Sequence, residues 1–411
     1  MFSNLGYGLK TSFKTVIILC LLLGMLPTHA LEPSGLSFGG GWTLLPSVVY
    51  QVTEDSNAYL QSEKNKEAAT VTRIRPELLL RLDTPKALYE MSYVLEQGAY
   101  STNANDNYTD QSLELSLIRS FGRRMEGTFA SSYVLGHDAR GAGVDEGITA
   151  IEDVFYPDKH RTLKASASLG IGADASLLGN RVYVSVLDKN YLNNYDRGTA
   201  DREYQEATLG DLMSFYISPI TDIILEARWA RVDYQSPSEV AQLKEGWKQT
   251  YLAGASWDIS GKVSGSMKFG TTSRTFDDSS VPSNSSLSWE GSLVWTPKSH
   301  AEVTVDTSRG FNESSGSGLY VLTSELSSSW SHSFSVFIAT EVGLGYQQNE
   351  IFTDNVVERK DVTISSDLKL IYSPSRSMDI TTGVSIDQRD SELDSLNYDR
   401  VVFTLGLTLG V

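Results

Sequence analysis

Cysteine is nearly absent from this chain: Cys20 is the single one among 411 residues. It lies in an N-terminal segment that we expect to be removed, so the exported protein would carry no disulfide, no thiolate nucleophile and no cysteine metal site. Histidine is scarce as well, and the remaining histidines fall in different loops and turns, at His137, His160, His300 and His332. Because neither metal-ligand spacing nor a nucleophile paired with a base appears, we predict a protein with no catalytic activity, no metal and no cofactor.

Long apolar runs are missing beyond the first thirty residues. Lys10 and Lys14 precede a short apolar stretch from Thr15 to Met25, and Ala30 offers a small residue for cleavage. This order is typical of a secretory signal peptide, so we predict a signal at 1–30 and one exported domain at 31–411. After residue 30 no run of eighteen apolar residues occurs, and no membrane-spanning helix is expected.

Basic residues are outnumbered by acidic ones. The chain has 34 Lys and Arg against 51 Asp and Glu, and removal of Lys10 and Lys14 gives a net charge of 32 − 51 = −19. A nucleic acid is itself a polyanion and would be repelled. The composition therefore argues against a nucleic-acid partner.

What the chain does contain is a period of two. In the last eleven residues, Val401 to Val411, every odd position is apolar and most even ones are Thr or Gly. Such a segment is a strand with one apolar and one polar face. Similar segments recur at 42–52, 69–82, 87–98, 109–120, 124–135, 160–171, 180–190, 202–216, 222–234, 247–258, 262–275, 286–296, 300–309, 319–330, 334–347, 359–372, 378–388 and 398–411.

Tight turns and long polar loops alternate between these segments. The turns are rich in Pro, Gly and Ser, as at 218–221, 331–333 and 373–376. Aromatic residues flank both kinds of connection, and we interpret them as two belts at the membrane interfaces. They are Phe121, Tyr216, Trp257, Trp295, Trp330 and Tyr372 at the turns, and Tyr100, Tyr108, Tyr133, Tyr234, Tyr251, Phe276, Tyr346 and Tyr398 at the loops.

The pattern predicts an all-β fold: a single transmembrane antiparallel up-and-down β-barrel of about 18 strands, with 16 as the alternative. Such a barrel resides in the outer membrane, with lipid as its first partner. Two positions break the alternation, and for each we expect a local bulge. Pro76 interrupts the apolar face of its strand, and Asp211 has the same parity as Met213 and Phe215.

Parity also assigns charged residues to the lumen, because a charge facing lipid at mid-depth costs a few kcal/mol. The row of arginines beside a row of glutamates at 73–96 would either set up a transverse field or form salt bridges that stiffen the wall. The pore-lining candidates are Arg73, Arg75, Glu77, Arg81, Glu90, Glu96, Glu226, Arg228, Lys268, Glu290, Glu302, Glu325, Glu341, Asp367 and Lys369.

The longest loop spans 136–158, and its second half, 147–156, is unusually apolar for a solvated loop. Two hypotheses account for this composition. The loop folds into the lumen as a partial gate, or it packs on a neighbouring loop.

Two strand–turn phrases, Tyr216-Ile217-Ser218-Pro219 and Tyr372-Ser373-Pro374-Ser375, resemble those of the putative β-barrel porin 2 family. The blocks at 75–78 and 87–93 resemble it too, and the likeness covers nearly all of 31–411. The resemblance implies an outer-membrane barrel of the kind found with exopolysaccharide and capsule loci. We therefore expect a passive conduit exporting an exopolysaccharide or capsular polysaccharide, with periplasmic and inner-membrane export proteins as partners. The alternatives are a general or solute-specific diffusion porin and a structural or adhesive surface barrel.

Overall fold

The computed structural model describes residues 35–146, 156–172, 177–259, 261–316, 318–353 and 356–411. The predicted signal at 1–30 lies outside this range. Within the described residues, eighteen long strands form the barrel. They are β2 (Trp42–Asp55), β3 (Ala69–Thr84), β4 (Ala87–Tyr100), β5 (Tyr108–Phe121), β6 (Met125–Asp138), β7 (Asp158–Ile171), β8 (Leu178–Tyr191), β9 (Tyr204–Ser218), β10 (Thr221–Tyr234), β11 (Gly246–Ile259), β12 (Val263–Phe276), β13 (Asn284–Lys298), β14 (Ala301–Glu313), β15 (Tyr320–Ser333), β16 (Ile338–Thr353), β17 (Val356–Ser375), β18 (Met378–Ser391) and β19 (Tyr398–Gly410).

Short helical turns occupy some of the connections. The described residues contain no helix long and apolar enough to cross a membrane. A two-residue strand, β1 (Leu36–Ser37), pairs with the start of β2. The helical turns are η1 (Gly39–Gly41), η2 (Ala104–Asp106), η3 (Gly143–Asp145), η5 (Tyr195–Arg197), η6 (Thr199–Arg202), α2 (Glu239–Gln242) and η7 (Asp394–Leu396).

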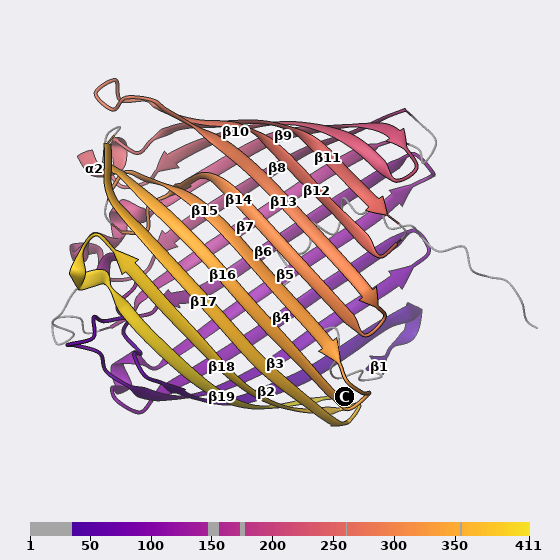
Figure 1. The fold of residues 1–411 in the computed structure, drawn as a ribbon, viewed down its shortest axis with the longest axis horizontal. Coiled ribbons are helices and arrows are strands. Elements are labelled where there is room, and N and C mark those ends of the chain that lie inside the picture. Colours follow the sequence, from indigo (N-terminus) through magenta and orange to yellow (C-terminus); the bar gives the residue numbers. More distant parts are fainter. Residues whose placement is uncertain (1–34, 147–155, 173–176, 260, 317, 354–355) are drawn as a thin grey trace, which may run out of the picture.

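The sheet closes on itself. Each strand pairs antiparallel with its neighbours in the sequence, and β19 pairs with β2 from Val402↔Asp55 to Gly410↔Ser47. Closure leaves no unpaired edge along the long strands, so the backbone hydrogen bonds are satisfied within the sheet, as a membrane span requires. The strands run obliquely, with the C-terminus and short turns at one end and α2 with the long loops at the other (Figure 1). The predicted antiparallel barrel of 18 strands is confirmed.

The alternation places apolar side chains outside. On β19, Phe403 and Leu405 are both 60% exposed, whereas Val402 and Gly406, which have the opposite parity, are buried. At the short-turn end, tight turns join successive strands. In the β5–β6 turn, Gly122 (φ +78°) provides the left-handed backbone that the turn needs. The outer surface is thus an apolar band that lipid can cover.

Both expected bulges are wrong. Around Pro76 the register against β2 is continuous, and against β4 the same register resumes on both sides, with only the bridges at Arg75 and Pro76 missing. Proline has no N–H to donate, so the ladder loses bonds without gaining a residue. The register is also regular at Asp211. Its carboxylate accepts a 2.5 Å hydrogen bond from the amide of Asn180 on β8, a polar partner that satisfies it on the lipid side.

The predicted turn at 331–333 is also misplaced. Ser331–Ser333 end strand β15, and the turn is made by residues 334–337, so β16 begins at Ile338 and not at residue 334. The amide of Phe334 donates to the carbonyl of Ile338 across this turn. Phe334 and Phe337 are exposed there, and their apolar character extended the apparent strand.

The aromatic belts are only half as predicted. At the short-turn end Phe121, Trp295, Trp330 and Tyr372 are exposed on the outer face. At the long-loop end Tyr133, Tyr251 and Tyr346 are exposed, but other aromatics turn inward. The inward rings have the inner parity of their own strands, and this parity outweighs the preference of aromatic residues for the interface. They are Tyr100, Tyr108, Tyr234, Phe276 and Tyr398 at the long loops and Tyr216 at a short turn.

The hairpin order gives a test of sidedness. Long loops of such barrels face outward and short turns face the periplasm, so epitope tags near Asn105 and Asp278 should be reached by antibody on intact cells. A tag at Lys298, beside a short turn, should be reached only after the outer membrane is opened. Labelling at Lys298 on intact cells with none at Asp278 would invert the orientation.

Candidate functional site: the inner wall and the mouth

Charged side chains from adjacent strands pair along the inner wall. On β3, Arg73 lies 3.9 Å from Glu96 of β4. Tyr108 of β5 links the two, donating to Glu96 at 2.6 Å and accepting from Arg73 at 2.9 Å. Further down the same strands the pairs are Arg75–Glu77 at 2.7 Å and Arg81–Glu90 at 3.7 Å. The rows predicted at 73–96 therefore form salt bridges.

A second group on the opposite part of the wall is more compact. Lys268 of β12 contacts Glu226 of β10 at 2.5 Å and Glu290 of β13 at 2.6 Å. Arg228 contacts both glutamates, Glu226 at 3.2 Å and Glu290 by a short ion pair. Tyr183 of β8 donates to Glu226 at 2.7 Å. Two cations and two anions alternate, so the cluster is locally neutral and rich in hydrogen-bonding groups.

The remaining candidates lie on β14 to β17, on the same inner parity. Lys369 contacts Glu341 at 3.2 Å. Glu325 accepts a 2.7 Å hydrogen bond from the Gln347 amide. In the described part of the chain, three of the fifteen candidates join no ion pair: Glu302, Glu325 and Asp367. The fifteen candidates thus form separate local clusters on one surface and do not converge on a single centre.

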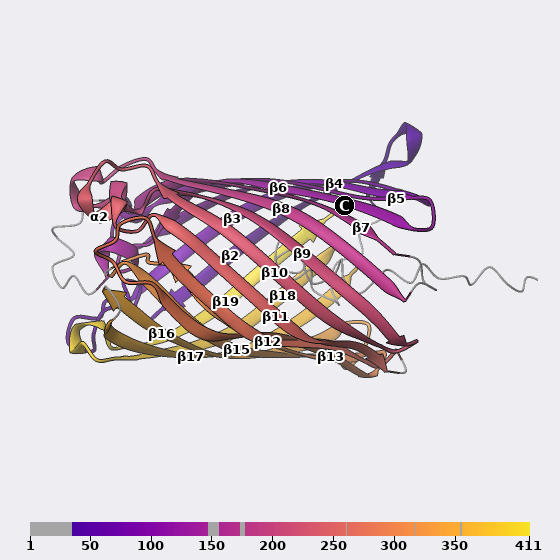
Figure 2. The same cartoon turned by 90° about the horizontal axis from the view of Figure 1, so that it is seen from above.

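Above this wall, residues 139–146 cross the barrel mouth; we call them the mouth segment. It leaves the end of β6 and reaches β17 and β18, and β6 and β17 lie in opposite walls of the barrel (Figure 2). At its far end Glu146 contacts Arg359 of β17 at 2.9 Å and Arg389 of β18 at 2.5 Å. The described residues 139–146 of the long loop therefore span the mouth.

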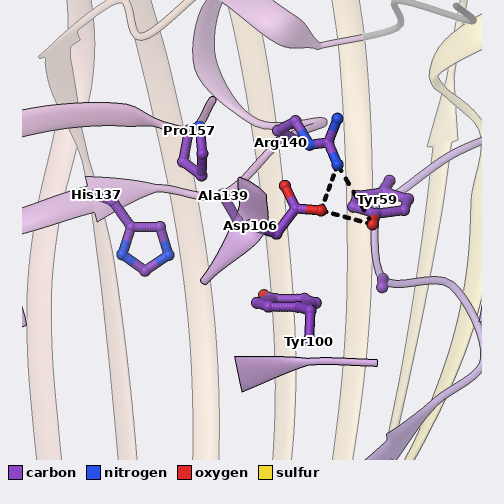
Figure 3. Close-up of a pocket in the computed structure, with 8 residues that line it drawn as sticks. Tyr59, Tyr100, Asp106, His137, Ala139, Arg140 and Pro157 are labelled. Atoms are coloured by element: carbon purple, nitrogen blue, oxygen red, sulfur yellow. Dashed lines mark hydrogen bonds and ion pairs between the residues drawn. The ribbon is translucent and has the colours of Figure 1, made fainter. Parts of the chain in front are cut away.

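Arg140 anchors the near end of the mouth segment (Figure 3). Its guanidinium forms a short ion pair with Asp106 of η2 and lies over the ring of Tyr59, 4.9 Å from the ring centroid. Tyr59 donates to the same carboxylate at 2.7 Å. Burial, reinforced by Asp106, raises the pKa of Tyr59 to about 12, so the hydroxyl stays a donor at neutral pH. Gly141 (φ +87°) passes so close that an added Cβ would lie 1.9 Å from the Tyr59 carbonyl oxygen.

A third anchor lies beside Glu146, near the far end of the mouth segment. Asp145, 2% exposed, forms a short ion pair with Arg197 of η5. Burial and the nearby Asp158 raise the pKa of Asp145 to about 6, against the opposing effect of Arg197. From another side, a Cβ at Gly316 would lie 3.2 Å from the carbonyl oxygen of Gly143, so the β14–β15 loop also abuts the segment.

The sequence reasoning missed these anchors. The apolar residues 147–156 indicate either a partial gate or packing on a neighbouring loop, and 147–155 lie outside the described residues. The contacts come instead from charged residues in 139–146. The i, i+2 pair Arg359 and Asp361 and the inner parity of Arg389 were available signals on the strands, but their partner lies over 200 residues away in the chain.

A closed eighteen-strand barrel with an apolar outer band and a polar, charged inner wall defines an outer-membrane porin-like protein. The sequence profile described as putative beta-barrel porin 2 matches residues 29–410. The chain therefore belongs to that family. A search of curated proteins gave no matching relative.

Solved structures resemble the fold at low identity. They include the FrpB iron transporter from Neisseria meningitidis (11% identity, TM-score 0.46, 86% of this chain and 62% of that one). The siderophore receptor PirA from Pseudomonas aeruginosa is 9% identical (TM-score 0.42, 90% and 80%). P. aeruginosa FpvA, solved with pyoverdines, is 10% identical (TM-score 0.48, 92% and 69%). The chain spans 62% of the length of the first of these.

Proposed function

We propose that this barrel is a passive outer-membrane conduit for a secreted exopolysaccharide or capsular polysaccharide, without catalysis. The observation that carries the proposal is the inner wall, where charges are neutralised in pairs among hydroxyl-bearing side chains. A hydrated sugar chain exchanges hydrogen bonds readily with such groups and meets no strong local field. A barrel of eighteen strands is too wide for its side chains to fill, which leaves room for a solvated polymer.

In this proposal the mouth segment is the part that moves. Its three anchors are ion pairs to separate elements, at Arg140, Asp145 and Glu146, and not ladder hydrogen bonds. Releasing them would clear the mouth without disturbing the barrel. Periplasmic and inner-membrane export proteins would deliver the polymer at the short-turn end.

Deletion of the gene should leave polymer trapped in the periplasm while sugar synthesis continues, because the last barrier would then lack its conduit. The measurement is polysaccharide in the medium and in the periplasmic fraction, with a plasmid-borne wild-type copy restoring export. Unchanged extracellular polymer would reject the proposal.

The second candidate is a general or solute-specific diffusion porin, and the mouth segment favours it, since porins narrow their path with an inward loop. In the same deletion strain, reduced uptake of a small solute with unchanged polymer would support this candidate. If both transport measurements are unchanged but surface attachment falls, the barrel acts as a structural or adhesive surface protein.

A further inference from the structure

Two guanidinium groups at the rim of the barrel hold a carboxylate that does not belong to the wall. Arg359 of β17 and Arg389 of β18 both contact Glu146, which the mouth segment brings from the opposite side of the barrel. Resting on the function proposed above, we infer that this pair is a binding site for carboxylates of an acidic polysaccharide, such as a polyuronate, and that Glu146 is its internal competitor.

The wall positions the two guanidiniums firmly. Asp361 of β17, 2% exposed, contacts Arg359 at 3.0 Å and Arg389 at 2.6 Å from one side. Glu146 occupies the other side, which faces the mouth segment. In the β17–β18 ladder Arg389 pairs with Thr363, which follows Arg359 on the same strand β17. The sheet therefore fixes the distance between the backbones of the two arginines. Arginine forks held in this way suit planar carboxylates.

The charge balance favours a ligand once Glu146 leaves. With Glu146 in place, two cations face two anions. Departure of Glu146 removes one of the two carboxylates that both arginines contact, so the charge around them becomes more positive by one. The Nε of Arg389 is buried and has no hydrogen-bond partner among the described residues, so donor capacity remains. A uronate carboxylate would replace the same chemical group, and the exchange costs little desolvation.

The mouth segment as a whole is also negatively charged. Residues 139–146 contain one Arg, one Asp and one Glu, a net charge of −1. Its displacement therefore makes the mouth more positive by one charge. An acidic chain that enters the mouth would compete with Glu146 and hold the segment aside, coupling the presence of polymer to opening.

Single-channel recording of the full-length barrel in a planar bilayer tests the site. The probes are hexagalacturonate and uncharged maltohexaose, added at the long-loop side at equal concentration. Wild-type current should be interrupted by the acidic oligomer and much less by the neutral one. Glu146→Gln should strengthen the acidic block about tenfold, because removal of an internal competitor raises the fraction of competent sites.

Arg389→Gln should abolish the preference for the acidic oligomer. The matched control is Arg400→Gln, which removes a neighbouring rim guanidinium that contacts Asp55 and Asp387 and not the mouth segment. It should keep the preference. Heat-modifiable gel mobility verifies that each variant is folded.

Equal block by both oligomers in the wild type, or equal effects of Arg389→Gln and Arg400→Gln, would overturn the site and leave the conduit proposal standing. Selective block in a protein whose deletion leaves polymer export unchanged would keep the carboxylate site and refute its link to polysaccharide. The recording and the deletion experiment therefore fail independently.

Discussion

Arginine at Leu405 should prevent or weaken barrel assembly, whereas arginine at the adjacent Thr404 should be tolerated. Leu405 is 60% exposed on the outer face of β19, on the strand that closes the barrel against β2. A charge there faces lipid and costs about 2–4 kcal/mol near the bilayer midplane. Thr404 has the opposite parity and faces the inner wall, where water solvates the new charge.

The same contrast should hold for Leu407 and Thr408, one step further along the strand. Folded barrels resist unfolding in detergent and migrate faster on gels before heating, so heat-modifiable mobility measures assembly directly. We expect no shifted band, or a faint one, for the leucine variants and a normal band with altered conductance for the threonine variants. Equal tolerance at both parities would mean that residues 398–410 are not a lipid-facing strand.

Most of the barrel was predictable because its information is local. Each strand carries its own alternation, and a lipid-facing charge is costly, so parity alone located the eighteen strands and the inner charges such as Lys268 and Glu290. The same rule, applied to Tyr108 and Tyr234, would have placed them inside. The general preference of aromatic residues for the membrane interface predicts a belt there instead, and the parity of the strand overrides that preference.

The remainder depends on contacts between distant parts of the chain. Asp211 is accommodated on the outer face because Asn180, on the preceding strand β8, donates a hydrogen bond to its carboxylate. No sequence pattern in either strand predicts that hydrogen bond. The mouth is a stronger case, since Glu146 meets Arg359 only after the barrel has closed. The sequence contains both charges, but nothing local relates them.

The mouth segment provides the second large effect. Residues 31–411 contain no cysteine, so Glu146→Cys with Arg389→Cys yields a pair of unique thiols at the far anchor. The parent side chains meet at their tips, with 2.5 Å between Glu146 Oε1 and Arg389 Nη1. Their Cβ atoms are therefore too far apart for a direct disulfide, and a reducible bis-methanethiosulfonate of matching length is the suitable cross-linker.

The matched control is Glu63→Cys with Lys66→Cys, an exposed ion pair of 2.7 Å within a single loop. A cross-link there stays within one loop and does not cross the mouth, so conductance should not change. At the mouth, the unlinked pair lacks the far anchor and should conduct several-fold more than the wild type. Cross-linking should pin the segment across the opening and lower the current.

Single-channel conductance of the Glu146→Cys, Arg389→Cys protein, followed through cross-linking and reduction in one bilayer, tests most directly that the lumen is a solute path obstructed by residues 139–146. We predict high conductance before the reagent, a fall to the wild-type level or below after it, and recovery with reductant. A conductance that stays constant through all three steps, as in the Glu63→Cys, Lys66→Cys control, would contradict the account.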